Sequence, residues 1–210
     1  NGQLFTLALP ALMEFTSPRA WAFALIGIHE YLRRLSGDSL VNQIREILTS
    51  RLMELLRQNE KPDWCWFEEE LSYDNAKFSH ALILCGRATG QPEVLERGLQ
   101  TLRWLSDLQF TEKGHFRPIG SNGFYSRGGV RANFDQQPIE AQAMVSACLE
   151  AYRTTSELWW YDKAQRAFDW FIGWNDLGLE LYAPETGGCY DGLHVDRVIR
   201  NQGAESTLAF

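Results

Sequence analysis

Two kinds of helical segment alternate along the chain. One kind is apolar on almost every side, and the other carries a single apolar stripe at intervals of three and four residues. A helix that is apolar all round must be buried, whereas a striped helix covers a core and turns its polar back to water. The predicted inner helices lie near residues 20–35, 77–88 and 139–153, and the predicted outer helices near residues 39–57, 93–109 and 158–173.

This alternation is typical of an all-α fold, the α/α toroid, in which helical hairpins form an inner and an outer ring. We expect residues 1–210 to form a single toroid domain, because no linker or internal boundary interrupts the pattern. A further helix begins near residue 204, and residues 4–13 look like the end of an outer helix. The chain supplies about three and a half hairpins. It is therefore predicted to be part of a larger toroid, or a toroid that closes differently.

The connections between the predicted helices differ in length. Turns from an inner to an outer helix are short and carry helix-stopping or helix-starting residues. The long connections, from an outer helix to the next inner one, cover residues 62–76, 112–138 and 176–203. Because hairpins are antiparallel, we expect these loops to meet at one end and to bound an acidic, aromatic-lined cleft. The glycine-rich residues 120–129 predict a small hairpin within the second loop.

Carboxylates recur at or just before the predicted starts of the inner helices. Glycoside hydrolysis needs one protonated carboxyl for the leaving oxygen and one carboxylate that activates water or attacks carbon. The predicted acid–base pair is Asp74 and Asp135. The alternates are Asp191 and Glu205, and Glu140 lies alongside. Crowding should raise the pKa of at least one acid. The alternative is helix capping, because an acid before a helix accepts backbone N–H bonds and complements the helix dipole.

Aromatic and amide side chains accompany the acids in the same loops. Aromatic rings can stack on sugar rings, and amides offer both donors and acceptors to sugar hydroxyls. The predicted substrate-binding residues are Trp64, Trp66, Glu69, Tyr73, Asn75, Phe134, Gln136, Gln137, Tyr190, His194, Asn201 and Gln202. The alternatives are that the rings wedge their loops against the helices and that the amides bond loop backbone.

Composition narrows the choice of partners. The net charge of −7 argues against nucleic acid, because phosphate binding needs clustered Lys and Arg. No apolar run approaches the roughly 18 residues that span a bilayer, so no membrane contact is expected. The four cysteines are scattered and form no Cys-x-x-Cys pair, which favours reduced thiols and a cytoplasmic location. Metal-ligand spacings and phosphate-binding glycine motifs are missing, and we therefore predict no metal site and no cofactor.

Four loop segments carry a resemblance to a known group of proteins. They are Trp-Phe-Glu-Glu-Glu-Leu-Ser-Tyr-Asp-Asn-Ala at 66–76, Phe-Asp-Gln-Gln-Pro-Ile-Glu-Ala at 134–141, Gly-Gly-Cys-Tyr-Asp-Gly-Leu at 187–193 and Asn-Gln-Gly-Ala-Glu-Ser-Thr at 201–207. With these segments, nearly the whole chain resembles bacterial α/α-toroid domains that accompany glycosyltransferase modules. At fold level it also resembles six-hairpin glycosidases, including unsaturated glucuronyl hydrolases. That resemblance implies catalysis by acids at successive inner-helix starts, and Asp74 and Asp135 match those positions.

Three functional hypotheses follow. The leading one is a carbohydrate-active domain that acts on glycosides through paired carboxylates. The second is a non-catalytic saccharide-binding or scaffolding domain of a glycosyltransferase, which needs rings and amides but no carboxyl pair. The third is a sugar epimerase or isomerase, for which His29 and His80 would face each other. The expected partners are a saccharide and either a glycosyltransferase module or a second copy of the chain, since an unclosed ring leaves apolar surface open.

Overall fold

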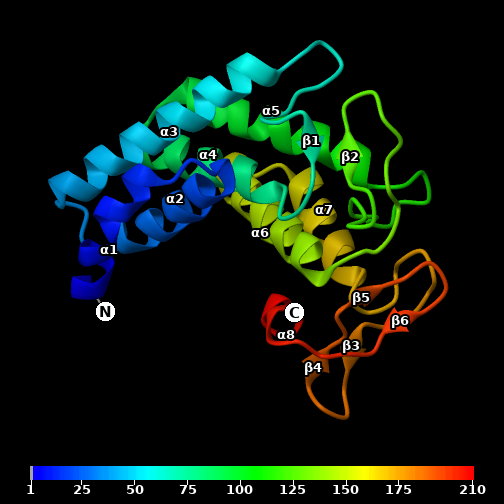
Figure 1. Cartoon of the computed structure of the whole chain (residues 1–210). Coiled ribbons are helices and arrows are strands. Elements are labelled where there is room, and N and C mark those ends of the chain that lie inside the picture. Colours follow the sequence, from blue (N-terminus) through cyan, green and yellow to red (C-terminus); the bar gives the residue numbers. More distant parts are fainter. Residues whose placement is uncertain (1) are drawn as a thin grey trace. The chain divides into compact units, whose positions relative to one another are not determined.

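Helices dominate the chain (Figure 1). The computed structural model describes the backbone of residues 2–210. Its helices are α1 (Gly2–Glu14), α2 (Pro18–Leu32), α3 (Ser39–Asn59), α4 (Ala76–Thr89), α5 (Pro92–Gln109), α6 (Pro138–Thr155), α7 (Leu158–Asp169) and α8 (Ala204–Ala209). The prediction of an all-α fold is confirmed. No helix within residues 2–210 is both long and apolar enough to cross a bilayer.

The six predicted helices are all present, and their ends lie within a few residues of the predicted ones. The larger differences are at two C-termini. α2 ends at Leu32 because the chain turns over residues 33–37. α7 ends at Asp169, and Gly173 soon after it has a φ of 99°, a backbone conformation that stops a helix and favours glycine.

The chain divides into two compact units. Unit 1 consists of Asn1–Glu68 and Lys77–Thr101, and unit 2 consists of Glu69–Ala76 and Leu102–Phe210. The single domain expected over residues 1–210 stays a prediction.

Apolar side chains of the helices hold unit 1 together. α2 packs on α3, and both Leu25 and Leu52 are 0% exposed. The rings of Trp66, Phe67 and Phe78 meet with centroid distances of 4.9 to 5.8 Å. Burying side chains of this size stabilises a fold by about 1.5–3 kcal/mol each. This ring cluster therefore fixes the loop after α3 to the start of α4.

In unit 2, α6 and α7 form one helical hairpin, and they differ in burial. α6 buries a broad face with small residues such as Ala143, Ala147 and Ala151, which recur every four positions. α7 buries only a narrow stripe, Trp160, Ala164 and Ala167. The difference confirms, for this hairpin, the predicted alternation of a buried helix with a striped one.

Short antiparallel strand pairs order the loops of unit 2. The pairs are β1 (Glu70–Leu71) with β2 (Tyr125–Ser126), β3 (Tyr182–Ala183) with β4 (Gly188–Cys189), and β5 (Gly192–Leu193) with β6 (Val198–Ile199). Residues 120–129 do not form the predicted hairpin of their own, because β2 pairs with β1 instead. Gly120 N bonds to Ala132 O at 2.8 Å, so the start of this stretch is tied to the approach to α6.

Candidate functional site

Most residues that the sequence singles out lie in one unit. The four predicted catalytic acids belong to unit 2, as do all the predicted binding residues except Trp64 and Trp66. Backbone contacts join the loops that carry them. β1 of the first loop pairs with β2 of the second, and Gln136 exchanges two backbone hydrogen bonds of 3.0 and 2.9 Å with Leu193 of the third. The structure therefore brings parts of all three loops together within unit 2.

Asp135 and His194 lie beside each other where the second and third loops meet. Asp135 Oδ1 is 3.7 Å from His194 Nε2, and the two side chains are 29% and 33% exposed. The other ring nitrogen, His194 Nδ1, donates a 3.1 Å hydrogen bond to Asp196 Oδ1, because a carboxylate can only accept. That bond lowers the pKa of Asp196. Asp135 is thus a half-buried carboxylate beside a ring that can carry a proton.

Asp74 and Glu140 form a buried pair of acids. Asp74 is 0% exposed and Glu140 is 4% exposed. Glu140 Oε1 accepts a hydrogen bond from Asp74 N, and Glu140 Oε2 accepts one of 3.2 Å from Asn75 Nδ2. Burial raises the pKa of Glu140 from 4.5 to about 7; the charge of Asp74 acts in the same direction, and the hydrogen bonds oppose it. The acid whose pKa lies near neutral is therefore Glu140, which is not one of the four predicted catalytic acids.

A second cluster fixes Gln136. Its side-chain amide donates to Asp176 Oδ2 at 2.6 Å and accepts from Trp170 Nε1 at 2.7 Å. Asp176 also accepts hydrogen bonds from His115 Nε2 at 2.9 Å and from Arg117 Nε at 2.8 Å. Burial acts to raise the pKa of Asp176, but these hydrogen bonds outweigh it and lower the pKa. Gln136 is 0% exposed, so its buried amide links the second loop to Trp170 and Asp176.

The sequence indicates only some of the residues in these two clusters. Glu140 stands in the first turn of a predicted inner helix, and its place two residues after Pro138 was the available signal. No sequence signal marks Arg117 or Asp176, because each lies in a polar loop segment without a distinctive motif. Their bond joins positions 59 residues apart, which sequence spacing does not reveal.

Asp191 serves the start of α8. Its Oδ1 accepts a 2.7 Å hydrogen bond from Gly203 N, and its Oδ2 accepts one from Asn201 Nδ2. Burial acts to raise the pKa of Asp191, but bonds from Asn201, Gly203 and Ser206 lower it. This is the arrangement that the capping alternative describes. Glu205, in the first turn of α8, is exposed.

The predicted binding residues divide by exposure. Asn75 and Gln136 are fully buried. Trp64 and Trp66 are 2% and 0% exposed within unit 1, where they are packed as the wedging alternative describes. The remaining residues are exposed or half-buried and so open to a ligand: Glu69, Tyr73, Phe134, Gln137, Tyr190, His194, Asn201 and Gln202.

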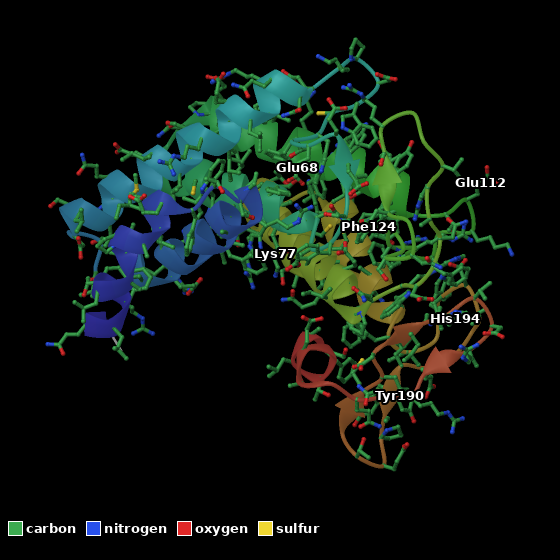
Figure 2. The ribbon with its side chains drawn as sticks, in the orientation of Figure 1. Glu68, Lys77, Glu112, Phe124, Tyr190 and His194 are labelled. Carbon is green, nitrogen blue, oxygen red and sulfur yellow. The ribbon has the colours of Figure 1, made fainter. Side chains whose placement is uncertain are left out.

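A cavity of about 750 Å³ is lined by residues of the third loop, the segment that joins α7 to α8 along the chain. Its polar lining consists of Glu180, Tyr190, His194, Asp196, Arg197 and Arg200. Figure 2 shows Tyr190 and His194 on the segment that carries β3 to β6. A volume of this order suits a small-molecule ligand. Another cavity, of about 600 Å³ and lined by Trp21 and side chains of α3, contains none of the predicted site residues.

The other sequence hypotheses concern histidines and metal ligands. His29 in α2 and His80 in α4, which the isomerase hypothesis requires, both belong to unit 1. Among residues 2–210, no group of three or more His, Cys, Asp and Glu side chains is arranged to hold a metal ion.

Comparison with known proteins supplies a fold but no family. No protein-family model matches the sequence, and no curated protein matches it. A similar solved structure is that of an unsaturated glucuronyl hydrolase specific for heparin, with a TM-score of 0.60 and 15% sequence identity. The match covers 80% of this chain and 48% of the hydrolase chain. The chain therefore spans about half the length of that hydrolase.

The fold is the α/α toroid, as in that hydrolase. This likeness confirms the predicted fold class and the fold-level resemblance to six-hairpin glycosidases. Because one fold can host many activities, the chemistry has to be argued from the residues of the site.

Proposed function

We propose that unit 2 binds a saccharide and acts on its glycosidic bond, with Asp135 as the carboxylate that exchanges a proton with the substrate. The observation that carries the proposal is the 3.7 Å approach of Asp135 Oδ1 to His194 Nε2, since His194 also lines the 750 Å³ cavity. Tyr190 adds an aromatic ring to that cavity. Asp135 is therefore a half-buried acid next to a residue of the cavity lining, and a carboxyl close to a ligand cavity is what glycoside hydrolysis needs.

Hydrolysis of a glycoside breaks the bond between the anomeric carbon and the leaving oxygen. A carboxyl gives a proton to that oxygen, the hydroxyl of water goes to the carbon, and a carboxylate takes the remaining proton of the water. We assign the proton transfer to Asp135, because its carboxyl is partly exposed. Asp74 is the second carboxylate of the pair in this proposal, and its burial keeps bulk water away from it. The fold shared with a heparin-specific hydrolase makes unsaturated heparin oligosaccharides the first substrates to try.

The test compares wild-type chain with Asp135→Asn on a panel of unsaturated and saturated oligosaccharides. Losing the carboxyl should lower kcat by about 100-fold or more, since positioned proton transfer contributes at that level. The fold should survive, with a change in unfolding free energy under about 1 kcal/mol. Asp107→Asn, an exposed acid of α5, is the matched control and should keep full turnover. An unchanged rate in Asp135→Asn would remove Asp135 from the mechanism.

A second candidate function is a non-catalytic saccharide-binding domain that serves a glycosyltransferase. The observation that favours it is the burial of Asp74 and Glu140, together with the capping role of Asp191. Glu140 and Asp191 use their carboxylate oxygens on neighbouring groups of the chain, and Asp74 is 0% exposed, which leaves the exposed rings and amides as the ligand surface. Calorimetric titration with the same oligosaccharides separates the two functions. Binding with no turnover, equal in wild type and Asp135→Asn, would select the binding domain.

A further inference from the structure

The first turn of α6 carries a buried acid that does not serve its own helix. A Glu at the third helical position commonly reaches back to the backbone N–H that precedes that helix. Glu140 occupies this position, but both of its carboxylate oxygens accept hydrogen bonds from the loop before α4. Asp74 N donates to Oε1, and Asn75 Nδ2 donates to Oε2 at 3.2 Å.

These bonds act on a backbone turn with an unusual conformation. Asp74 has a φ of 54°, in the left-handed region that Asp and Asn tolerate better than most residues. Asn75 Nδ2 also donates to Ser72 O at 3.2 Å, so the same amide ties the turn to Glu140 and to itself. The direction in which the Asp74 side chain leaves the backbone is set by this turn. Glu140 holds the turn from the side of α6.

We propose that Glu140 is a positioning residue, which orients the Asp74 carboxyl by holding its backbone N–H and never touches the substrate. This inference rests on the proposed function, because the orientation matters only if Asp74 belongs to the acid–base pair. Both carboxylate oxygens of Glu140 accept hydrogen bonds from the turn that carries Asp74, which agrees with a role through another residue. A bound sugar would meet Asp135 and the cavity lining instead.

The charge of Glu140 makes this contact measurable. Burial raises the pKa of Glu140 to about 7, and Asp74 is the charged neighbour that acts on it. A carboxylate accepts a hydrogen bond more strongly than a protonated carboxyl does. The N–H of Asp74 should therefore respond to pH near neutrality, where the acceptor gains its charge.

The experiment records the backbone amide resonance of Asp74 in the full chain from about pH 5 to about pH 9. We expect the resonance to move downfield with a midpoint close to that of the Glu140 carboxyl. In Glu140→Gln the pH response should vanish, because the amide side chain does not titrate. Hydrogen exchange at Asp74 N should also become about tenfold faster, since the bond that protects it is weakened.

The matched control is Glu93→Gln. Glu93 lies in the first turn of α5 directly after Pro92, and its side chain is 72% exposed. This variant should leave the Asp74 resonance and its exchange rate unchanged. If Glu140→Gln does not fold, the wild-type titration still decides the matter. A resonance of Asp74 that stays flat while the Glu140 carboxyl titrates overturns the proposal.

Turnover distinguishes this inference from the function on which it rests. On an active glycoside, Glu140→Gln should lower kcat by about tenfold and leave KM within about twofold, because binding groups are untouched. Its rate should also lose the pH limb that follows Glu140. If Asp135→Asn abolishes turnover while Glu140→Gln keeps wild-type kcat and pH profile, the function stands and the positioning role fails. If no glycoside is turned over, the function fails, and the amide titration still supports Glu140 as the residue that orients Asp74.

Discussion

The side-chain amide of Gln136 donates a hydrogen bond of 2.6 Å to Asp176, 40 residues further along the chain. This bond connects the residue after Asp135 to a carboxylate that also accepts from His115 and Arg117. The loop that carries Asp135 is therefore anchored by a charged, largely buried group. Such a group stabilises the fold only while its partners remain in place.

Asp176→Asn tests how strongly this anchor contributes. The substitution leaves the Arg117 guanidinium without its anionic partner and turns an amide N–H toward other donors. We expect the free energy of unfolding to fall by about 3 kcal/mol, as measured by urea denaturation near neutral pH. Asp162→Asn removes an acid that pairs with Arg166 at 2.8 Å on the exposed side of α7, and it should change stability by less than about 0.5 kcal/mol. Equal losses in the two variants would show that Asp176 is no anchor.

Titration of Glu140 should contribute to the pH dependence of the free energy of unfolding. Its pKa is raised from 4.5 to about 7, so the folded chain holds this proton more tightly than the unfolded chain. The contribution of Glu140 to the free energy of unfolding is complete below about pH 4.5 and is lost as pH rises through about 7. The free energy lost over this range is about 3 kcal/mol. Asp176 has the opposite sign, because its pKa is lowered and its contribution is lost only as pH falls below its ordinary value of 3.8.

The measurement is chemical denaturation at several pH values between about 5 and about 8. Wild type and Glu93→Gln should both lose stability as pH rises across this window. Glu140→Gln should show a flatter profile, because its side chain does not titrate. A profile as steep as that of wild type would assign the pH dependence to other groups.

The helices could be predicted because each long apolar pattern reports burial directly. α6 and α7 illustrate this, since the small residues around Ala147 and the stripe through Ala164 give opposite patterns and opposite burial. The strands could not be predicted, because each has two residues and a period of two cannot show in so short a run. Their pairing is set by contacts such as Glu70 with Ser126, which join different loops.

The sequence predicts which loops carry the site, but it does not predict which side chains in those loops contact one another. Sequence placed Asp135 and His194 in neighbouring loops, and the structure brings the two side chains together. The sequence predicts Trp66 as a substrate-binding ring of the first loop, whereas the structure buries it against Phe67 in unit 1. Loop composition does not say which face of a ring is covered. The glycosyltransferase module and the second copy of the chain stay predictions.

Gly120→Ala tests the backbone approach that closes the second loop. A methyl group on Gly120 would overlap the carbonyl oxygen of Phe134, and the backbone on either side would have to move. We expect a loss of about 2 kcal/mol in the free energy of unfolding, as for other overpacked sites. Gly37→Ala is the control, because its methyl group would meet no atom within 4 Å. If both variants unfold at the same denaturant concentration, the close approach of Gly120 to Phe134 has no bearing on stability.

Tyr190 should contribute to saccharide affinity through its ring. It is half-buried at the 750 Å³ cavity, and its hydroxyl donates a 3.2 Å hydrogen bond to Glu185 outside the cavity lining. Ring contacts of this kind contribute about 0.5–1.5 kcal/mol beyond area burial, so Tyr190→Ala should weaken binding by up to about tenfold. Tyr190→Phe keeps the ring and loses only the hydroxyl, and it should bind within about twofold of wild type.

Titration calorimetry with an oligosaccharide that wild type binds provides the measurement. Tyr161→Ala is a suitable control, because Tyr161 is a 49% exposed ring on α7 and does not line the cavity. The ring hypothesis requires the order wild type, then Phe, then Ala in affinity, with the Tyr161 variant equal to wild type. An equal loss in Tyr190→Phe and Tyr190→Ala would assign the contribution to the hydroxyl. Unchanged affinity in Tyr190→Ala would place the saccharide away from this cavity, and the site would then have to be sought around the exposed rings of the first two loops.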